Sequence, residues 1–344
     1  MKEFKILALD GGGVRGLFSS RVLQEIESAN GSIAEHFDML CGTSTGGLIT
    51  LALATGKSAG EVVEFYQRWL PKIFPAGKLG RFWRDKFRFY LWKGKYTDKY
   101  LRRAAQEVLG ETCMRESNSY LCIPSVNLTT ASPYVFKTDH DPSLTRDSDM
   151  LMADVAMATA AAPFYFPVAN SSRVPGGEYI DGGLWANNPA LVGLIEACRF
   201  FAGPEKPYSA VRILSVPVIS PTVGYTVGKK RGLSIRSFAK AIADVTFETQ
   251  QKATGHFINL MSRSLDFDVT YVRVQPPNVS AEIRRHLGLD IATKQAMDLL
   301  MNFGHSVGQE YNTRPEVTRF FEERALKPIF RASEERGKAH VQLS

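Results

Sequence analysis

Cysteine is scarce in this chain, whose 344 residues include only Cys41, Cys113, Cys122 and Cys198. These four are widely spaced, form no CxxC pair and have no cluster of histidines near them in the sequence. A disulfide framework or a structural zinc site needs closer and more regular spacing. We therefore expect neither, and we expect that no metal is required. The cysteine usage fits a reducing compartment.

Long hydrophobic runs are also missing. No apolar stretch approaches the ~18 residues that a membrane-spanning helix needs. The first residues, MKEFKILALDGGG, pass directly from a charged start into an apolar strand pattern and show no signal-peptide features. The expectation is a soluble cytoplasmic protein.

Internal repeats and low-complexity linkers are absent as well, and 44% hydrophobic residues suffice for the core of one large domain. Short apolar strand patterns alternate with helical patterns over residues 1–220, from FKILAL (4–9) to VRILSVPV (211–218). Such alternation is typical of an α/β fold with a mostly parallel central sheet and helices on both faces. Residues 221–344 are predicted to form a mainly helical C-terminal part of the same domain.

A nucleophile motif lies between a strand pattern and a helix pattern. Residues 42–46, GTSTG, match GxSxG, in which a serine occupies a sharp strand-to-helix turn. Gly42 and Gly46 suit that turn because a Cβ there would collide with the neighbouring chain. The helix N-terminus also directs N–H dipoles toward Ser44, where they favour negative charge on a substrate oxygen. A tight turn without a catalytic role fits the bare pattern, but the flanking strand and helix favour a catalytic Ser44.

A second GxSxG match, GHSVG at 304–308, lacks this context. The residues before it have a helical period, and no aspartate follows Ser306, whereas an α/β-hydrolase needs an acid and then a histidine after its serine. We predict a helix end there. The GKS tripeptide at 56–58 is similar to the end of a phosphate-binding loop but lacks that loop's first glycine, because position 51 is leucine.

Ser44 needs a base, and histidine is the usual partner. None of the six histidines lies at an obvious strand end among small residues. A carboxylate is available instead in YIDGGLWANNP (179–189), where Asp181 ends a short strand pattern and Gly182 and Gly183 let other groups approach it. The sequence therefore predicts a dyad of Ser44 and Asp181.

The first strand pattern leads into LDGGGVRG (9–16), which places three consecutive glycines before a helix. Successive N–H groups of such a loop can turn toward an anion without obstruction by side chains. Gly11, Gly13 and Gly16 also complete the GxGxxG spacing of a dinucleotide site, which stays an alternative for this loop taken alone. No acid ends a second strand about 20 residues later, as that site requires, so an oxyanion hole is favoured.

The motifs DGGGxRG, GTSTGG and the later DGG follow one another in the order seen in patatin-like phospholipases, and the chain resembles that family from about residue 6 to residue 190. The resemblance implies a three-layer α/β fold, a catalytic core at 1–220, and hydrolysis of lipid acyl esters without a cofactor. The residues that it assigns are Ser44 and Asp181 for the dyad and Gly11, Gly12, Gly13 and Arg15 for the oxyanion loop.

Within that family, a chain of this size resembles the phospholipase effectors of cyclic-oligonucleotide-based anti-phage signalling. That resemblance implies activation by a cyclic dinucleotide, and we expect its site in the basic helical region 232–303, which would make 221–344 regulatory. An oligomer is compatible with the sequence. The alternatives that stay open are an unregulated lipase or thioesterase, a serine peptidase, and a catalytically silent lipid- or nucleotide-binding module of the same fold.

Positive charge is concentrated in residues 78–103, where ten Lys or Arg stand against two Asp and aromatic residues are interleaved. Such a stretch can bind anionic lipid, cover the core with its aromatics, or bind nucleic acid. We expect peripheral contact with the inner face of the cell membrane, with phospholipid as the substrate and no nucleic-acid polymer as a partner. The residues expected at the membrane are Trp83, Arg84, Arg88 and Trp92.

Overall fold

The computed structural model describes residues 2–75, 94–171, 177–219 and 235–330, with only the backbone of 235–244. The described residues form an eight-stranded sheet in the order β5-β6-β3-β2-β1-β7-β8, with β4 paired to β3 off this path. The strands are β1 (Glu3–Leu9), β2 (Met39–Gly42), β3 (Tyr120–Asn127), β4 (Ser132–Lys137), β5 (Ala169–Asn170), β6 (Glu178–Asp181), β7 (Ala210–Val216) and β8 (Asp268–Arg273). The strands from β3 to β8 along this path pair in parallel, which confirms the prediction of a mostly parallel sheet.

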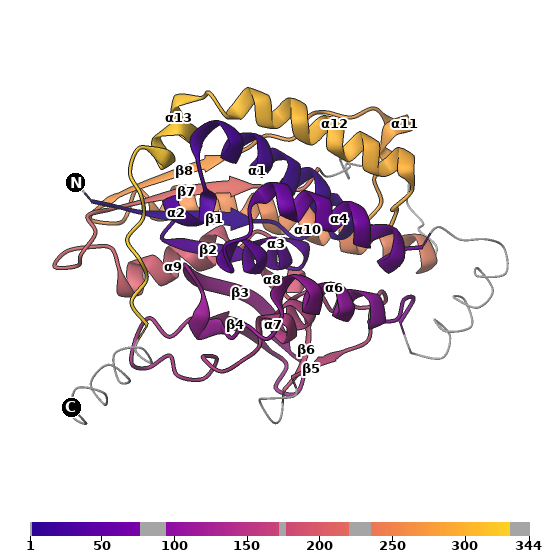
Figure 1. Cartoon of the computed structure of the whole chain (residues 1–344), viewed down its shortest axis with the longest axis horizontal. Helices are drawn as coiled ribbons and strands as arrows, with labels where there is room; N and C mark the ends of the chain where they lie inside the picture. Colours follow the sequence, from indigo (N-terminus) through magenta and orange to yellow (C-terminus); the bar gives the residue numbers. More distant parts are fainter. Residues whose placement is uncertain (1, 76–93, 172–176, 220–234, 331–344) are drawn as a thin grey trace.

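Helices cover both faces of the sheet (Figure 1). The first face carries α1 (Gly16–Asn30), α3 (Thr45–Ala54), α4 (Ala59–Ile73), α6 (Lys99–Leu109), α7 (Met152–Thr159) and α12 (Lys294–Tyr311). The second face carries α9 (Ala190–Phe200) and α10 (Ile235–Met261). Shorter helices are α2 (Ile33–His36), α8 (Gly183–Ala186), α11 (Ala281–Arg284) and α13 (Pro315–Thr318). The result is the three-layer arrangement that the resemblance implies.

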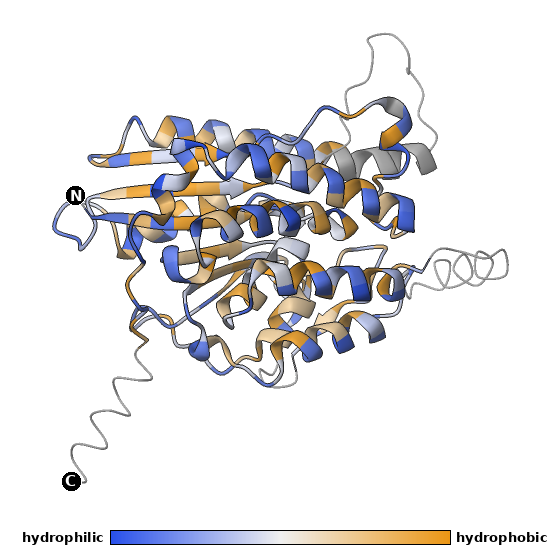
Figure 2. Cartoon of the chain, turned by 45° about the horizontal axis from the view of Figure 1, so that its top comes forward, coloured by the Kyte–Doolittle hydropathy of each residue, from blue (hydrophilic) through white to orange (hydrophobic). Residues whose placement is uncertain are grey.

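Strand β1 shows why the sheet is buried on both sides. Successive side chains of a strand point to opposite faces. Leu7 and Leu9 pack into the core on the α1 side, whereas Phe4, Ile6 and Ala8 pack into the core on the α9 side. The strand is therefore apolar at nearly every position, as a central parallel strand must be. Figure 2 shows the same pattern, with hydrophobic strands between the two helical layers.

Strand β3 brings distant segments together. One of its edges pairs with β4 along 122–127. The other edge is shared, because β2 pairs in parallel with 120–122 and β6 pairs antiparallel with 125–127. Strands β2 and β6 therefore run toward each other along one edge and their C-terminal ends meet. The elbow that follows β2 lies next to the aspartate that ends β6.

Two strands, β4 and β5, are not predicted by the sequence pattern. β5 has two residues, which is too short for any periodicity to be seen. β4 contains Pro133, and a proline within an apolar run argues against a central strand. The structure places β4 at an edge of β3, where a missing N–H is tolerated.

The second GxSxG match lies inside α12 and not at a helix end, because α12 continues to Tyr311. Its glycines serve helix packing. A Cβ at Gly304 would lie 2.8 Å from the carbonyl oxygen of Phe18, and one at Gly308 would lie 2.5 Å from the Cβ of Glu25. Both contacts are with α1, which α12 follows closely (Figure 1). Ser306 is exposed and its hydroxyl donates to the carbonyl of Asn302 in the same helix.

The described C-terminal elements pack against the N-terminal part of the chain. β8 extends the sheet beyond β7, and α12 packs on α1. A division at residue 220 and a regulatory role for 221–344 stay predictions. Among the described residues, none of the helices combines the length and the apolar character needed to cross a bilayer.

Candidate active site

Ser44 occupies the turn between β2 and α3 with φ 55° and ψ −121°. A residue other than glycine seldom adopts positive φ, and such strain is typical of functional positions. The turn also packs closely against β1. A Cβ at Gly42 would lie 2.3 Å from the carbonyl oxygen of Gly46, and one at Gly46 would lie 2.3 Å from that of Leu9. The turn thus has the geometry of a nucleophile elbow.

Asp181 faces this serine. Its Oδ2 accepts a hydrogen bond from Ser44 Oγ at 2.6 Å, and its Oδ1 accepts one from the N–H of Gly183 at 2.7 Å. Only 5% of Asp181 is exposed. Burial raises the pKa of this carboxyl to about 6, while the two hydrogen bonds favour the charged form and limit the rise. Asp181 is therefore ionised at neutral pH and more basic than an ordinary aspartate.

Thr159 holds the elbow in place. The N–H of Ser44 donates to Thr159 Oγ1 at 2.9 Å, and the threonine hydroxyl donates to the carbonyl of Pro124 in β3 at 2.6 Å. The amide of Ser44 is therefore already bonded and is not free for a substrate. This role of Thr159 is not predicted from the sequence, although Thr159 is the one hydroxyl residue in the stretch MATAAAP (157–163).

The glycine-rich loop passes beside the elbow. The N–H of Gly11 donates to the carbonyl of Asn187 at 3.0 Å, and the N–H of Val14 donates to that of Leu289 at 2.9 Å. Within the described part of the chain, the amides of Gly12 and Gly13 have no acceptor, and both residues line the cavity that contains Ser44. These two amides are thus placed to bind a substrate oxygen.

Gly13 and Arg15 shape this loop. Gly13 has φ +58°, and a Cβ there would lie 2.3 Å from the carbonyl oxygen of Leu289, so a side chain is excluded. Arg15 is buried, and its Nε donates to the carbonyl of Gly12 at 3.4 Å. The arginine therefore contacts the loop through its backbone.

A buried ion pair anchors the start of the loop. Asp10 is fully buried, and Arg273 of β8 donates to it through Nη1 at 3.2 Å and Nη2 at 2.6 Å. Burial raises the pKa of the Asp10 carboxyl, and Arg273 opposes that rise. Arg273 Nη1 also donates to Ser215 Oγ at 2.6 Å. Asp10 is the first residue of the DGGGxRG motif, whereas the role of Arg273 is not predicted from the sequence; the signal for Arg273 is one arginine within the apolar strand pattern VTYVRVQ.

An apolar channel leads away from Ser44 and Asp181. It encloses about 1100 Å³, counting its open mouth. Its walls include α4 and the turn at 162–166 that follows α7. The apolar side chains in these walls are Leu48, Phe65, Tyr66, Trp69, Leu70, Ile73, Phe74, Leu101, Phe164, Tyr165 and Phe166. A chain of methylene groups would be the favoured occupant of such a space.

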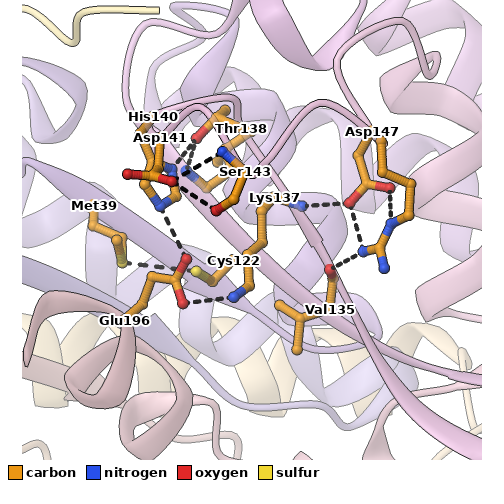
Figure 3. A network of polar contacts seen from close by, with 12 residues as sticks. Met39, Cys122, Val135, Lys137, Thr138, His140, Asp141, Ser143, Asp147 and Glu196 are labelled. Carbon is orange, nitrogen blue, oxygen red and sulfur yellow. Dashed lines mark hydrogen bonds and ion pairs between the residues drawn. The ribbon is translucent and has the colours of Figure 1, made fainter. Parts of the chain in front are cut away.

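No histidine of the described chain is bonded to Ser44 or Asp181. His140 instead belongs to a separate buried network, where its Nε2 lies 2.9 Å from Glu196 Oε1 and Lys137 Nζ donates to Glu196 Oε2 at 2.5 Å (Figure 3). His305 lies on α12, 3.0 Å from Glu25 on α1. These two histidines therefore serve as structural partners.

Two further predictions concern the surroundings of the site. The expected membrane residues Trp83, Arg84, Arg88 and Trp92 lie outside the described residues, so their role stays a prediction. In the described ranges, no group of three or more His, Cys, Asp or Glu side chains is arranged to hold a metal ion.

Comparisons with known proteins agree with this geometry. A family model described as patatin-like phospholipase matches residues 7–194. A cGAMP-activated phospholipase of Pseudomonas aeruginosa is 33% identical over 332 residues, which cover 95% of this chain and 94% of the relative. One from Vibrio cholerae is 32% identical and covers 94% of this chain and 96% of the relative. Patatin-like protein 1 of Arabidopsis thaliana is 30% identical, with 88% of this chain and 80% of the relative covered.

Among solved structures, human GIVD cytosolic phospholipase A2 aligns with a TM-score of 0.45 at 9% identity, over 93% of this chain and 60% of that chain. The family assignment rests on the matches in sequence, which include the elbow, the glycine-rich loop and Asp181. With its strand order, its elbow and its DGG turn, the chain belongs to the patatin-like phospholipase family.

Proposed function

We propose that this chain is a serine phospholipase that cleaves acyl esters with Ser44 as the nucleophile and Asp181 as the general base. The observation that carries this proposal is the 2.6 Å hydrogen bond from Ser44 Oγ to Asp181 Oδ2 in the wall of an apolar channel. A strained serine bonded to a buried carboxylate is an activated nucleophile next to its base. The family membership supports lipid as the substrate class.

The first half of the reaction forms an acyl-enzyme. Asp181 takes the proton of Ser44 as Oγ attacks the ester carbonyl carbon. The negative charge that develops on the carbonyl oxygen is stabilised by the free amides of Gly12 and Gly13. Collapse of the tetrahedral intermediate breaks the ester C–O bond, and the proton on Asp181 passes to the departing alcohol oxygen. The acyl group remains on Ser44.

The second half releases the fatty acid. A water molecule gives its proton to Asp181 and attacks the acyl carbon, and the same amides stabilise the oxyanion. The proton then returns to Ser44 Oγ as the ester bond to the serine breaks. One carboxylate serves both halves because its pKa of about 6 lets it accept and return a proton near neutral pH.

The channel argues for a long acyl chain as the bound part of the substrate. Its aromatic and aliphatic walls gain free energy from burying methylene groups, about 0.8 kcal/mol for each. A peptide or a charged nucleotide would leave polar groups unpaired against these walls. The intact dyad likewise speaks against a catalytically silent module, and the channel favours a lipase over a peptidase.

The mouth of the channel suits a membrane surface. Phe164 lines the channel, is 70% exposed and has φ 71°, and Leu184 lines it and is 43% exposed. Holding a phenylalanine in the left-handed region and exposed to water is unfavourable. Insertion of both side chains into the acyl boundary of a bilayer would offset that cost and align the channel with a lipid tail. We therefore place the protein peripherally on the membrane through this mouth.

Activation by cGAMP is the regulation that the relatives support. The two bacterial relatives are described as cGAMP-activated and are covered almost completely by this chain. A phospholipase that acts on the membrane of its own cell needs to be held inactive until it is required. We propose that a cyclic dinucleotide supplies this control, in a response to phage infection, and that the part after residue 220 binds it.

The first prediction concerns the dyad. Ser44→Ala and Asp181→Ala are each expected to abolish ester hydrolysis, and the double variant should be hardly worse than either single one, because the two residues act as one unit. The rates are measured on a phospholipid and on a soluble short-chain ester. Ser306→Ala is the matched control, since Ser306 sits in the second GxSxG and is expected to keep near wild-type activity. Substantial turnover by folded Ser44→Ala would contradict the assignment.

The second prediction concerns pH. The base must be ionised, so kcat/KM for a soluble ester should rise along a limb with its midpoint near pH 6, where the pKa of Asp181 lies. A limb near pH 4 would indicate an aspartate whose pKa is not raised.

The same pKa has a consequence for stability. Between about pH 4 and pH 6 the folded chain keeps a proton on Asp181 that the unfolded chain has lost, so the free energy of unfolding falls as the pH rises through this window. Asp181→Asn, which is neutral throughout, should unfold at a higher temperature than the wild type at pH 8. The difference should vanish near pH 4. A variant that is less stable at pH 8 would contradict this account.

The third prediction concerns regulation. Phospholipid hydrolysis should be low in the purified protein and should rise at least about tenfold with cGAMP. A switch from 1% to 99% active protein would need about 5.5 kcal/mol of differential binding. Titration calorimetry with a panel of cyclic dinucleotides tests binding, and Ser44→Ala should bind the ligand while staying inactive. High activity that no ligand changes would leave an unregulated lipase.

The fourth prediction concerns the channel mouth. Phe164→Asn and Leu184→Asn should lower hydrolysis of phospholipid vesicles by roughly tenfold, as expected for lost burial of one large apolar side chain, and should affect a soluble ester much less. Asparagine tolerates the left-handed backbone at position 164. Phe257→Asn is the control, because Phe257 is 50% exposed on α10 but does not line the channel. Equal losses on both substrates would argue against membrane insertion.

A further inference from the structure

The segment 184–187 lies between the two catalytic loops and bonds to both of them. The carbonyl of Ala186 accepts a hydrogen bond from Thr43 Oγ1, next to the nucleophile, at 2.6 Å. The carbonyl of Asn187 accepts from the N–H of Gly11 in the glycine-rich loop at 3.0 Å. Just before this segment, the N–H of Gly183 holds Asp181. The position of this short segment therefore determines how the base, the elbow and the oxyanion loop are aligned.

The segment includes the end of α8, a helix of four residues, which is too short to be stable by itself. A side chain from outside the three sequence motifs stabilises this segment through hydrogen bonds. Gln250 of α10 donates through Nε2 to the carbonyl of Leu184 at 2.5 Å, and its Oε1 accepts from the N–H of Asn187 at 3.2 Å. One amide group thus bonds a donor and an acceptor of the turn.

Asn187 extends this contact to the glycine-rich loop. Besides its carbonyl bond to the N–H of Gly11, its Nδ2 donates to the carbonyl of Gly11 at 3.4 Å. Asn187 therefore bonds both backbone groups of Gly11, and Gln250 in turn bonds the N–H of Asn187. Gly12 and Gly13, which present the free amides, follow directly.

Within the described structure, the side chain of Gln250 hydrogen-bonds only to Leu184 and Asn187. The next residue of α10, Gln251, bonds to Arg273, which holds Asp10 at the start of the glycine-rich loop. Gln251 Oε1 accepts from Nη2 of Arg273 at 3.4 Å, and Arg273 pairs with Asp10. Consecutive residues of α10 therefore bond to the two residues that hold the start of the glycine-rich loop, Asn187 at Gly11 and Arg273 at Asp10. Phe247, one turn earlier, lines the channel.

We propose that Gln250 is a positioning residue, which aligns the Asp181 turn with the oxyanion loop by bridging the carbonyl of Leu184 and the amide of Asn187. The proposal rests on the dyad of Ser44 and Asp181 proposed above. Under this proposal α10, which covers the second face of the sheet, helps to hold the site. Ser44, the proposed nucleophile, lies at the start of α3 on the first face.

The test replaces Gln250 by two residues of similar size. Gln250→Met removes both hydrogen bonds, while Gln250→Glu keeps the acceptor for Asn187 and removes the donor to Leu184. We expect kcat for a soluble ester to fall roughly tenfold in Gln250→Met, with KM changed less than about twofold. Thr249→Ala is the matched control, because the Thr249 hydroxyl is exposed and donates only to the carbonyl of Val245 in its own helix.

The pH profile separates positioning from a general loss of structure. The hydrogen bond from Ser44 lowers the pKa of Asp181, so a misaligned dyad should move the acidic limb of kcat/KM toward higher pH. Gln250→Glu should move it further because of its added negative charge. A loss of folded protein would lower the rate at every pH without moving the limb.

The proposal is supported if the limb moves upward in both variants and stays in place in Thr249→Ala. It is overturned if the limb keeps its wild-type position in both variants, whatever happens to the rate. Ser44→Ala is assayed in the same series. Activity in Ser44→Ala would instead overturn the dyad itself, so the two failures are distinguishable.

Discussion

The shared edge of β3 is the constraint on which the site depends. A strand has two edges, and β4 pairs with one of them along 122–127, so β2 and β6 must divide the other. Because one is parallel and the other antiparallel to β3, their C-terminal ends converge. Ser44 and Asp181 are 137 residues apart in sequence and still form a hydrogen bond of 2.6 Å. Any shift in the register of either strand would separate them, since one residue of slip turns every side chain to the other face.

Burial is the second constraint, and it sets the chemistry. Asp181 is ionised at neutral pH in a place that favours its neutral form, and Ser44 holds a backbone conformation that few residues adopt. Both features lower stability locally. The surrounding core offsets them, because β1 and β2, which lead into the site, place buried apolar side chains on both faces of the sheet. A carboxylate of raised pKa and a serine with a strained backbone can persist only in such a rigid setting.

Backbone hydrogen bonding explains how the loops stay in place. The glycine-rich loop, the elbow and the turn after Asp181 are irregular segments whose N–H and C=O groups are buried and need partners. They find them largely in one another and in a few side chains, among them Thr159, Arg273 and Gln250. These side chains come from α7, β8 and α10, so both helical layers and the sheet contribute to one site. Among the described residues, the amides of Gly12 and Gly13 have no acceptor and face the cavity at Ser44.

Local requirements are what the sequence by itself determined. Apolar strands between amphipathic helices indicate the three-layer fold, and the glycines beside Ser44 and Asp181 are demanded by tight turns that no larger residue fits. These are short-range constraints, so they are visible in short patterns. The same five-residue pattern at 304–308 lies in a helix, because the flanking residues have a helical period.

Tertiary structure alone decided which distant residues support the site. Nothing in the sequence near Thr159, Asn187 or Gln250 marks them, since a lone polar residue acquires its role from the group that it meets in the folded chain. The raised pKa of Asp181 is likewise due first to its burial in the folded chain. The function of the glycines in α12 follows from the close approach of α1, which no local pattern reveals. Long-range pairing along β3 brought these groups together, and it depends on the register of the whole sheet.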